Sequence, residues 1–157
     1  MKNNIALNAL AAASIVLGVP VASEAATARQ VPAQPANSVI HYRTAKVEGL
    51  DIFYREAGPK DAPTVLLLHG FPSSSFQYRN LIPALADRYH VIAPDYPGFG
   101  KSSAPDHAKF AYTFAHLTDV TEALLGQIGV NSYTIYIQDY GAPIGLRLAL
   151  RHPYRVS

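Results

Sequence analysis

One carboxylate stands at the end of an apolar strand in this sequence. The stretch YIQDYGAPIG (136–145) runs from β-branched and aromatic residues through Asp139 into a segment with Gly and Pro and then helix-forming residues. A sharp strand-to-helix turn lifts its central residue above the sheet, and Gly141, Ala142 and Gly145 are small enough for the close backbone approach that this turn needs. Since the positive end of a helix favours an ionised carboxylate, Asp139 is a candidate nucleophile that attacks carbon and forms a covalent ester. The alternative is that Asp139 is only the N-cap of the helix.

A histidine–glycine pair follows the end of another apolar strand. The motif HGFP (69–72) comes directly after the run Thr64–Leu68. A backbone N–H behind such a strand end, together with the N–H behind a nucleophile, can form an oxyanion hole. The candidate donors are the amides of Phe71 and Tyr140. An ordinary Gly-Pro turn would also explain the glycine and the proline, but it leaves His69 without a reason.

The segment APDYPGFGKSSAPD (93–106) contains Gly-Lys-Ser, a combination found in phosphate-binding loops. Such a loop needs a glycine at position 95 and a helix directly after Ser102. This chain has Asp95 at the first position and Pro105 shortly after the second. The pattern therefore disfavours phosphate binding, and we expect Asp95 and the glycines to shape a loop beside the site of Asp139.

Alternating strands and helices are expected to position these motifs. Two strand patterns flank Gly49 as in an antiparallel hairpin, and three apolar runs behind them are typical of strands buried on both faces. The expected strands are 39–48, 50–58, 64–70, 89–95 and 132–139, and YRVS (154–157) has the pattern of a further strand start.

The helix between the last two of these strands is the clearest. Thr113 can cap its start, Gly129 can end it, and its apolar residues fall on one helical face. The members of that face are Phe114, Leu117, Val120, Leu124, Leu125 and Ile128. Helices are also expected over 74–88, divided or kinked at Pro83, and over 140–153, ended by Pro153.

Repeated strand–helix–strand units predict an α/β fold with right-handed crossovers and a parallel sheet covered on both faces. Chemistry in such sheets gathers at the carboxyl ends of the strands. Three loops lie there, after Leu68, after Pro94 and after Gln138. The site of Asp139 and the HGFP motif should therefore meet at one rim of the sheet.

Composition limits the classes of function. A length of 157 residues suits one domain, and 49% hydrophobic with 15% charged residues is typical of a globular chain. The net charge of +2 gives no basic patch, so no nucleic-acid partner is expected. Without cysteines the chain has no disulfides and no thiolate zinc site, and nothing in the sequence calls for a metal or an organic cofactor.

The N-terminus has the layout of a secretory signal peptide. A short polar start precedes the apolar run IALNALAAASIVLGVPVA, and small residues behind it allow cleavage after Ala25 or after Ala28. The expected division is a signal peptide at 1–25, a Pro- and Ala-rich linker at 26–37 and a folded domain at 38–157. The mature protein would be periplasmic or secreted, without stable membrane association. The alternative, an uncleaved anchor, is disfavoured by Asn8 and Pro20 within the apolar run.

The residues then show a family likeness. LLLHGFPSSSFQYRNLIPALADRYHVIAPDYPGFGKSSAPD (66–106) and YIQDYGAPIGLRLALRHPYRV (136–156) resemble the α/β hydrolase superfamily, and more closely its epoxide hydrolase and haloalkane dehalogenase branch. The likeness covers about residue 39 to the end. It implies a partial α/β-hydrolase fold, with a mostly parallel sheet and an N-terminal antiparallel hairpin, which stops before the cap and the C-terminal strands. Asp139 takes the place of Ser in the family's G-x-S-x-G elbow, and Ile137 replaces the first glycine.

The resemblance implies a two-step hydrolysis of a small apolar electrophile by water. Asp139 would form an alkyl-enzyme ester, and the amides of Phe71 and Tyr140 would hold the charge that develops when water attacks it. The family's peptide bond before the proline of HG-x-P is commonly cis, so Phe71–Pro72 is a candidate. Similar dehalogenases usually carry Asn at position 71 and Trp at position 140 to hold the halide, whereas epoxide hydrolases favour HGFP. Epoxide chemistry is therefore favoured, with a dehalogenase that has another halide clamp as the alternative.

The family places its acid and its catalytic histidine after later strands, beyond residue 157. The six histidines present are His41, His69, His90, His107, His116 and His152, and none has the family's position for the base. The 157-residue chain is therefore expected to be inactive in turnover, and the family's strand order would leave 132–138 as an apolar edge that invites aggregation. A non-catalytic binding module that keeps the scaffold is the remaining alternative.

Overall fold

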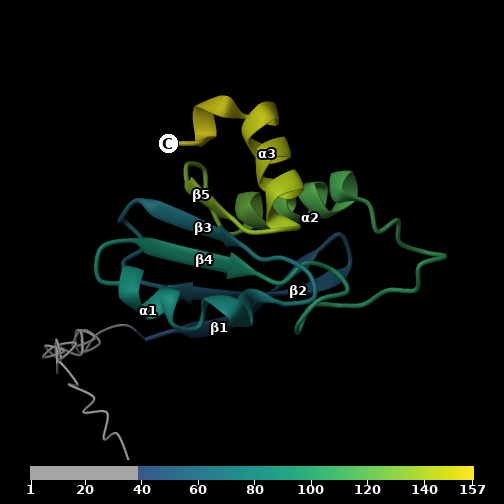
Figure 1. Ribbon diagram of the computed structural model, residues 1–157, viewed down its shortest axis with the longest axis horizontal. Coiled ribbons are helices and arrows are strands. Elements are labelled where there is room, and N and C mark those ends of the chain that lie inside the picture. The colour runs from purple at the N-terminus through teal and green to yellow at the C-terminus, as the bar shows by residue number, and fades with distance from the viewer. Residues whose placement is uncertain (1–38) are drawn as a thin grey trace, which may run out of the picture. The chain divides into compact units, whose positions relative to one another are not determined.

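The computed structural model describes residues 39–157. The predicted signal peptide (1–25) and the predicted linker (26–37) lie outside the described residues. A five-stranded mixed sheet with the strand order β1-β2-β4-β3-β5 forms the centre (Figure 1). Its strands are β1 (His41–Val47), β2 (Leu50–Ala57), β3 (Thr64–Leu68), β4 (His90–Pro94) and β5 (Thr134–Ile137). The helices are η1 (Ser75–Tyr78), α1 (Leu81–Leu85), α2 (Phe114–Gln127), α3 (Gly141–Arg151) and η2 (Pro153–Arg155), of which η1 and η2 are 3₁₀ helices.

The strand directions confirm the predicted α/β architecture. β1 pairs with β2 in an antiparallel hairpin, and its turn is made by Glu48 and Gly49, both with positive φ as a tight hairpin requires. β2 runs antiparallel to β4, while β4, β3 and β5 are parallel to one another. The carboxyl ends of these three strands therefore lie at one rim of the sheet.

Helices cover the sheet on both faces. β3 is buried throughout its last three residues, and these alternate between the two faces, with Leu66 and Leu68 toward one cluster and Leu67 toward the other. The first cluster also contains apolar residues of α2 and α3, and the second contains residues of η1 and α1. Burial on both faces explains why the parallel strands are almost continuously apolar.

The helix α2 forms as predicted. The hydroxyl oxygen of Thr113 accepts a hydrogen bond from the amide of His116 at 3.1 Å and so caps the first turn. Gly129 follows the helix with φ +77°, a conformation that a glycine adopts without steric cost. The apolar face predicted from the sequence faces the sheet, where Leu117, Val120 and Leu124 are buried.

The segment after β3 differs from the prediction. The chain divides into η1 and α1 at Arg79 and Asn80, not at Pro83. Pro83 is the third residue of α1, where an amide hydrogen has no partner within the helix, so its missing N–H costs nothing there.

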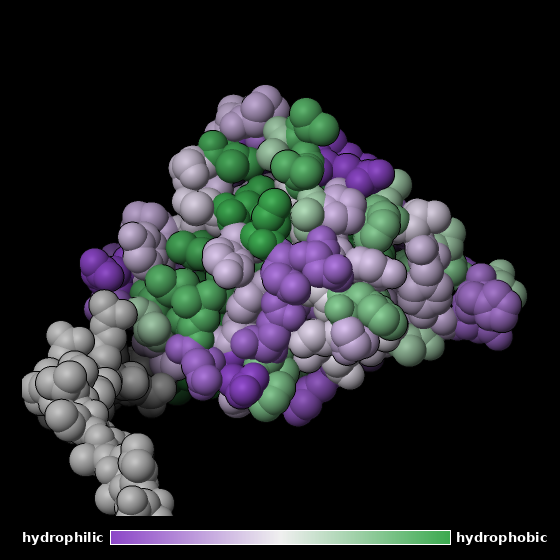
Figure 2. Space-filling view, in the orientation of Figure 1, coloured by the Kyte–Doolittle hydropathy of each residue, from purple (hydrophilic) through white to green (hydrophobic). Residues whose placement is uncertain are grey.

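The prediction of a third strand buried on both faces was wrong. β5 forms, but it lies at the edge of the sheet and three of its four residues are exposed. Figure 2 shows apolar side chains gathered over this edge and over α3, and the exposed members are Tyr136, Ile137, Leu146 and Leu150. The expected edge position is thus confirmed, and aggregation through it stays a prediction. The strand start predicted at 154–157 is only partly confirmed, because Tyr154 and Arg155 lie in η2 and Val156 makes a single parallel bridge with Tyr133.

Within residues 39–157, no helix is both long and apolar enough to cross a membrane.

Candidate active site

Asp139 lies at the top of a tight turn between β5 and α3. Its φ of +50° is unusual for a residue with a side chain, although Asp tolerates it better than most. The turn is possible because Gly141 packs so closely on Leu68 that a β-carbon would overlap the Leu68 carbonyl. Farther along α3, a β-carbon on Gly145 would collide with Ile137. Ile137 therefore fits in place of the family's first glycine because Gly145 leaves room for it.

The carboxylate of Asp139 is exposed and points at the HGFP loop. The amide of Phe71 donates a hydrogen bond of 2.7 Å to its Oδ1. No amide of α3 is hydrogen-bonded to the Asp139 side chain, and the N-terminus of α3 has no side-chain cap among the described residues. Asp139 is thus not a helix cap, and its position is fixed by a peptide that lies 68 residues earlier.

Gly70 must be a glycine for this contact to exist. A β-carbon there would overlap the side chains of Asp139 and Gln138. The next peptide bond, Phe71–Pro72, is cis, as the family resemblance implied. The HGFP loop and the elbow are therefore built against each other, and an ordinary Gly-Pro turn does not account for them.

His69 holds this loop from below. Its side chain is fully buried, with Nδ1 3.0 Å from the carbonyl oxygen of Gly70 and Nε2 3.4 Å from the amide nitrogen of Tyr96. These partners require a neutral ring that donates from Nδ1 and accepts at Nε2. Burial lowers the pKa of His69 below its ordinary value, which favours the same neutral form. Because the Gly70 carbonyl and the Phe71 N–H belong to one peptide unit, His69 orients the donor that reaches Asp139.

The loop 95–103 supports the same rim and binds its own chain. Asp95 is buried, and its two carboxylate oxygens accept hydrogen bonds from the amides of Ser75 and Lys101. The hydroxyls of Ser102 and Ser103 accept bonds from amides of β2. The hydroxyls of the serines that gave this loop its likeness to a phosphate site are therefore hydrogen-bonded to backbone amides of the protein.

A cavity of about 580 Å³ opens beside the elbow. Aromatic side chains form most of its wall, namely Phe71, Phe99, Tyr112, Phe114 and Tyr140. Their rings contact one another, with the Tyr140 centroid 5.0 Å from that of Phe114 and 5.6 Å from that of Phe71. Asp139 does not line this cavity, but both residues predicted to supply oxyanion amides do.

Arg147 is a member of this wall that the sequence analysis missed. It lies on α3 seven residues after Tyr140, so two helical turns place both side chains on the same face. This spacing was a usable signal. The contribution of Phe99 and Phe114 was not readable in the same way, because it depends on how a loop and the start of α2 pack in three dimensions.

The histidines are held elsewhere. His90 contacts Glu56 at the other end of the sheet, His152 contacts Glu122, and His116 stacks on Phe110. Within the part of the chain that the structure describes, no hydrogen bond joins a histidine to Asp139. The structure thus brings Asp139 together with Phe71 and Tyr140, and it places no base beside them.

The whole region from β3 onward matches a family model described as the alpha/beta hydrolase fold, over residues 63–157. The chain belongs to the α/β hydrolase fold family. The uncharacterized hydrolase YNR064C of Saccharomyces cerevisiae is 45% identical over 78% of this chain and 42% of its own length. A haloalkane dehalogenase of Psychrobacter cryohalolentis is 44% identical over 69% of the chain and 36% of its own length. The crystal structure of the epoxide hydrolase VrEH1 from Vigna radiata is 36% identical with a TM-score of 0.69, covering 74% of this chain and 37% of that one.

These relatives place this α/β hydrolase in the branch that contains haloalkane dehalogenases and epoxide hydrolases. The chain spans less than half the length of the curated relatives named above. What it shares with them is the part that carries the HGFP loop and the elbow.

Proposed function

We propose that Asp139 is the nucleophile of an epoxide hydrolase-like site. The observation that carries the proposal is the 2.7 Å hydrogen bond from the Phe71 amide to an exposed carboxylate held in a positive-φ turn between a strand and a helix. This arrangement supplies a nucleophile with one oxygen held by a backbone amide and the other without a hydrogen bond to any described protein group. The substrate class is a small apolar epoxide, in keeping with the aromatic wall of the cavity beside the elbow.

The contact with Phe71 assigns different roles to the two oxygens of Asp139. No described protein group is hydrogen-bonded to Oδ2, so Oδ2 would attack the epoxide carbon. The carbon–oxygen bond of the ring breaks, its electron pair goes to the ring oxygen, and that oxygen takes a proton from water. Oδ1 then becomes the carbonyl oxygen of the ester. It already lies where the Phe71 amide can stabilise negative charge when water attacks this ester, and the Tyr140 amide is the proposed second donor.

The side chains at positions 71 and 140 support epoxide rather than halide chemistry. A departing halide is held by side-chain N–H donors in the dehalogenases that this chain resembles. Phe71 and Tyr140 carry no side-chain N–H, and their rings pack together with centroids 5.6 Å apart. The identity with haloalkane dehalogenases supports the second candidate, a dehalogenase-like site with a different halide clamp.

We propose that the ester forms faster than it is hydrolysed in the 157-residue chain. General-base catalysis needs a base within hydrogen-bond reach of the attacking water. The histidine of the HGFP loop, His69, is buried with both ring nitrogens engaged. The covalent ester should therefore accumulate and be visible by mass.

Intact-mass measurement of the chain after incubation with styrene oxide tests this function. We expect one adduct, mapped by fragmentation to Asp139, and none in Asp139→Asn. Asn also tolerates positive φ, so that variant should fold. Asp106→Asn is the matched control, because it changes an exposed carboxylate in the loop between β4 and α2. This variant should keep the adduct. An unchanged adduct in Asp139→Asn would refute the proposal, and labelling by 1-bromobutane but not by styrene oxide would favour the dehalogenase candidate.

A further inference from the structure

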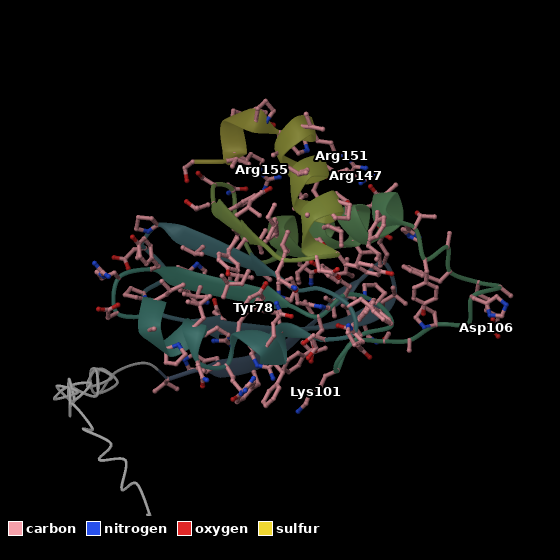
Figure 3. The ribbon with its side chains drawn as sticks, viewed as in Figure 1. Tyr78, Lys101, Asp106, Arg147, Arg151 and Arg155 are labelled. Atoms are coloured by element: carbon pink, nitrogen blue, oxygen red, sulfur yellow. The ribbon has the colours of Figure 1, made fainter. Side chains whose placement is uncertain are left out.

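Three arginines follow one another at intervals of four residues along α3 and η2 (Figure 3). Arg151 donates to the carboxylates of Asp119 at 2.6 Å and Glu122 at 3.2 Å. Arg155 donates to two backbone carbonyl oxygens behind α2, those of residues 130 and 131. Both are thus engaged with another part of the molecule.

Arg147 is different. Its Nη1 donates to the carbonyl oxygen of Pro143 at 2.7 Å, within its own helix, and no carboxylate of residues 39–157 lies within 4.0 Å of its guanidinium. An arginine carries five N–H donors in a planar fork that matches a carboxylate. Arg147 therefore has an uncompensated charge and most of its donors unbonded to the described residues.

A partner for Arg147 would have to lie in the aromatic cavity beside the elbow. Arg147 is the only charged side chain among the described residues that line this cavity, and Phe71 and Tyr140 belong to the same wall. The bond to Pro143 turns the arginine back toward the start of α3, so its guanidinium is about one turn, roughly 5 Å along the axis, from the level of Tyr140. A ligand that reaches from the elbow to Arg147 needs a rigid apolar spacer of about one aromatic ring.

Charge is the second reason for this assignment. Asp139 is negative at the site of attack, and by itself it would repel an anionic substrate. Arg147 places a positive charge on the wall of the cavity beside the elbow, where it would attract the anionic group of the substrate and leave the electrophilic carbon near Asp139. A neutral substrate would gain nothing from it.

We propose that Arg147 binds a carboxylate on the substrate, so that the preferred substrates are aromatic epoxides with a carboxylate across the ring from the oxirane. This inference rests on the proposed function of Asp139. The covalent step is the one given above: an Asp139 oxygen bonds to the oxirane carbon, the carbon–oxygen bond of the ring opens, and the alkoxide takes a proton from water. The carboxylate of the substrate takes no part in this step.

The test compares 4-(oxiran-2-yl)benzoate with 4-(oxiran-2-yl)benzamide, which has the same size and no charge. The rate of adduct formation at Asp139 is measured by intact mass at low substrate concentration. We expect the wild-type chain to react about tenfold faster with the benzoate, the size of effect that one charge-assisted hydrogen bond provides. Arg147→Gln should remove this preference by slowing only the benzoate, and Arg147→Lys should keep part of it.

Arg151→Gln is the matched control, because it removes an arginine of the same helix that is already paired. It should leave the ratio of the two rates unchanged. An equal ratio in wild type and Arg147→Gln, with Asp139 still labelled by the benzamide, would overturn this inference and leave the proposed function standing.

Failure of the nucleophile would look different. If neither epoxide labels Asp139, the affinity for the unreactive pair 4-ethylbenzoate and 4-ethylbenzamide decides the role of Arg147. Binding of the benzoate that is lost in Arg147→Gln supports it, and the absence of any difference between the two ligands refutes it.

Discussion

Both ends of the parallel strands carry a histidine and a carboxylate, but the two ends treat the carboxylate in opposite ways. At the amino ends, Glu56 is buried and contacts Arg43 and Lys60, with His90 Nε2 2.9 Å from its Oε1. At the carboxyl ends, Asp139 is exposed, and its carboxylate accepts one hydrogen bond, from the backbone amide of Phe71. A carboxylate surrounded by cations has its charge compensated and stabilises the fold, whereas one held by a single amide keeps an oxygen for reaction.

The histidines differ in the same sense. His90 bonds directly to Glu56 and, through its other nitrogen, to the hydroxyl of Thr64 at 3.2 Å. Within residues 39–157, His69 is hydrogen-bonded to no carboxylate and instead positions the peptide that holds Asp139. Residue types alone do not separate a structural network from a reactive one, because both ends contain His and an acid. The number of groups that contact the carboxylate does separate the structural network from the reactive one.

The largest loss of stability should come from the network around Glu56, at the amino ends of the parallel strands. Glu56→Ala leaves Arg43 and His90 without their shared acceptor. The Arg43 contact is partly exposed and the His90 contact is buried, so the loss of these hydrogen bonds should cost about 2 kcal/mol of unfolding free energy. Urea unfolding measures this loss. Asp51→Ala removes the exposed pair with Lys46 and should change the unfolding free energy by less than about 0.5 kcal/mol.

The same variant has a pH signature. Burial raises the pKa of Glu56, but hydrogen bonds from His90 and Arg43 outweigh it and the net pKa is lowered. A carboxyl with a lowered folded-state pKa stabilises the fold above its unfolded pKa of about 4.5, and this contribution is lost as the pH falls through the folded value. Wild type should therefore lose more stability than Glu56→Ala below about pH 4.5. Parallel pH curves for the two proteins would show that Glu56 is not the compensated carboxylate described above.

The next effect concerns the carboxyl end. His69→Leu removes the donor to the Gly70 carbonyl, so the Phe71 amide is no longer fixed against Asp139, and labelling of Asp139 by styrene oxide should slow about tenfold. His69→Asn keeps a donor close to the position of Nδ1 and should recover part of the rate. Both variants leave a cavity, so labelling is compared under conditions where circular dichroism shows each to be folded.

The stability of the fold should also depend on pH through His69. Burial lowers its pKa, so the folded state resists the protonation that the unfolded chain accepts below about pH 6.5, and stability falls as the pH drops below that value. This part of the pH dependence should be absent in His69→Asn. If the unfolding free energies of wild type and His69→Asn changed equally with pH between pH 5 and 6.5, a neutral, buried His69 would be contradicted.

Much of this comparison was readable in the sequence. The hairpin at Gly49, the apolar strands, the caps of α2 and the elbow at Asp139 follow from local patterns, because each depends on residues close together in the chain. The break after η1 was placed wrongly at Pro83, because a proline is harmful inside a helix but not in its first turn. The sequence also did not predict that Ile137 fits in the elbow, because the space for its side chain comes from Gly145, eight residues later.

The shared rim of the sheet predicted that the HGFP loop and Asp139 meet, but the individual hydrogen bonds of the two networks were not readable in the sequence. Glu56 and His90 meet because β2 runs beside β4, and the bond between the Phe71 amide and Asp139 joins residues 68 positions apart. Such contacts are set by strand order, which depends on the whole sheet. Arg147 lies between the two cases, since its spacing from Tyr140 predicts the shared helical face but not the aromatic wall opposite.

The smallest expected loss of stability comes from Thr64, and it tests whether the network at the amino ends of the parallel strands has only a structural role. Thr64, His90 and Glu56 form a chain of hydroxyl, imidazole and carboxylate that resembles a nucleophilic triad in order. Two features argue for a structural role: Glu56 is shared with Arg43 and Lys60, and Thr64 pairs with His90 in the β3–β4 ladder. Thr64→Val should cost about 1 kcal/mol in urea unfolding, the net value of one hydrogen bond, and leave Asp139 labelling unchanged.

A phosphonate ester gives the opposing outcome. If the hydroxyl of Thr64 were activated by His90, a phosphonylating reagent would modify it, and the adduct would disappear in Thr64→Val. We expect no modification of Thr64, because His90 contacts Glu56 and Thr64 within the sheet and is buried to all but 5% of its surface. A stoichiometric adduct on Thr64 would mean that the number of partners of a carboxylate does not distinguish structure from reaction in this fold.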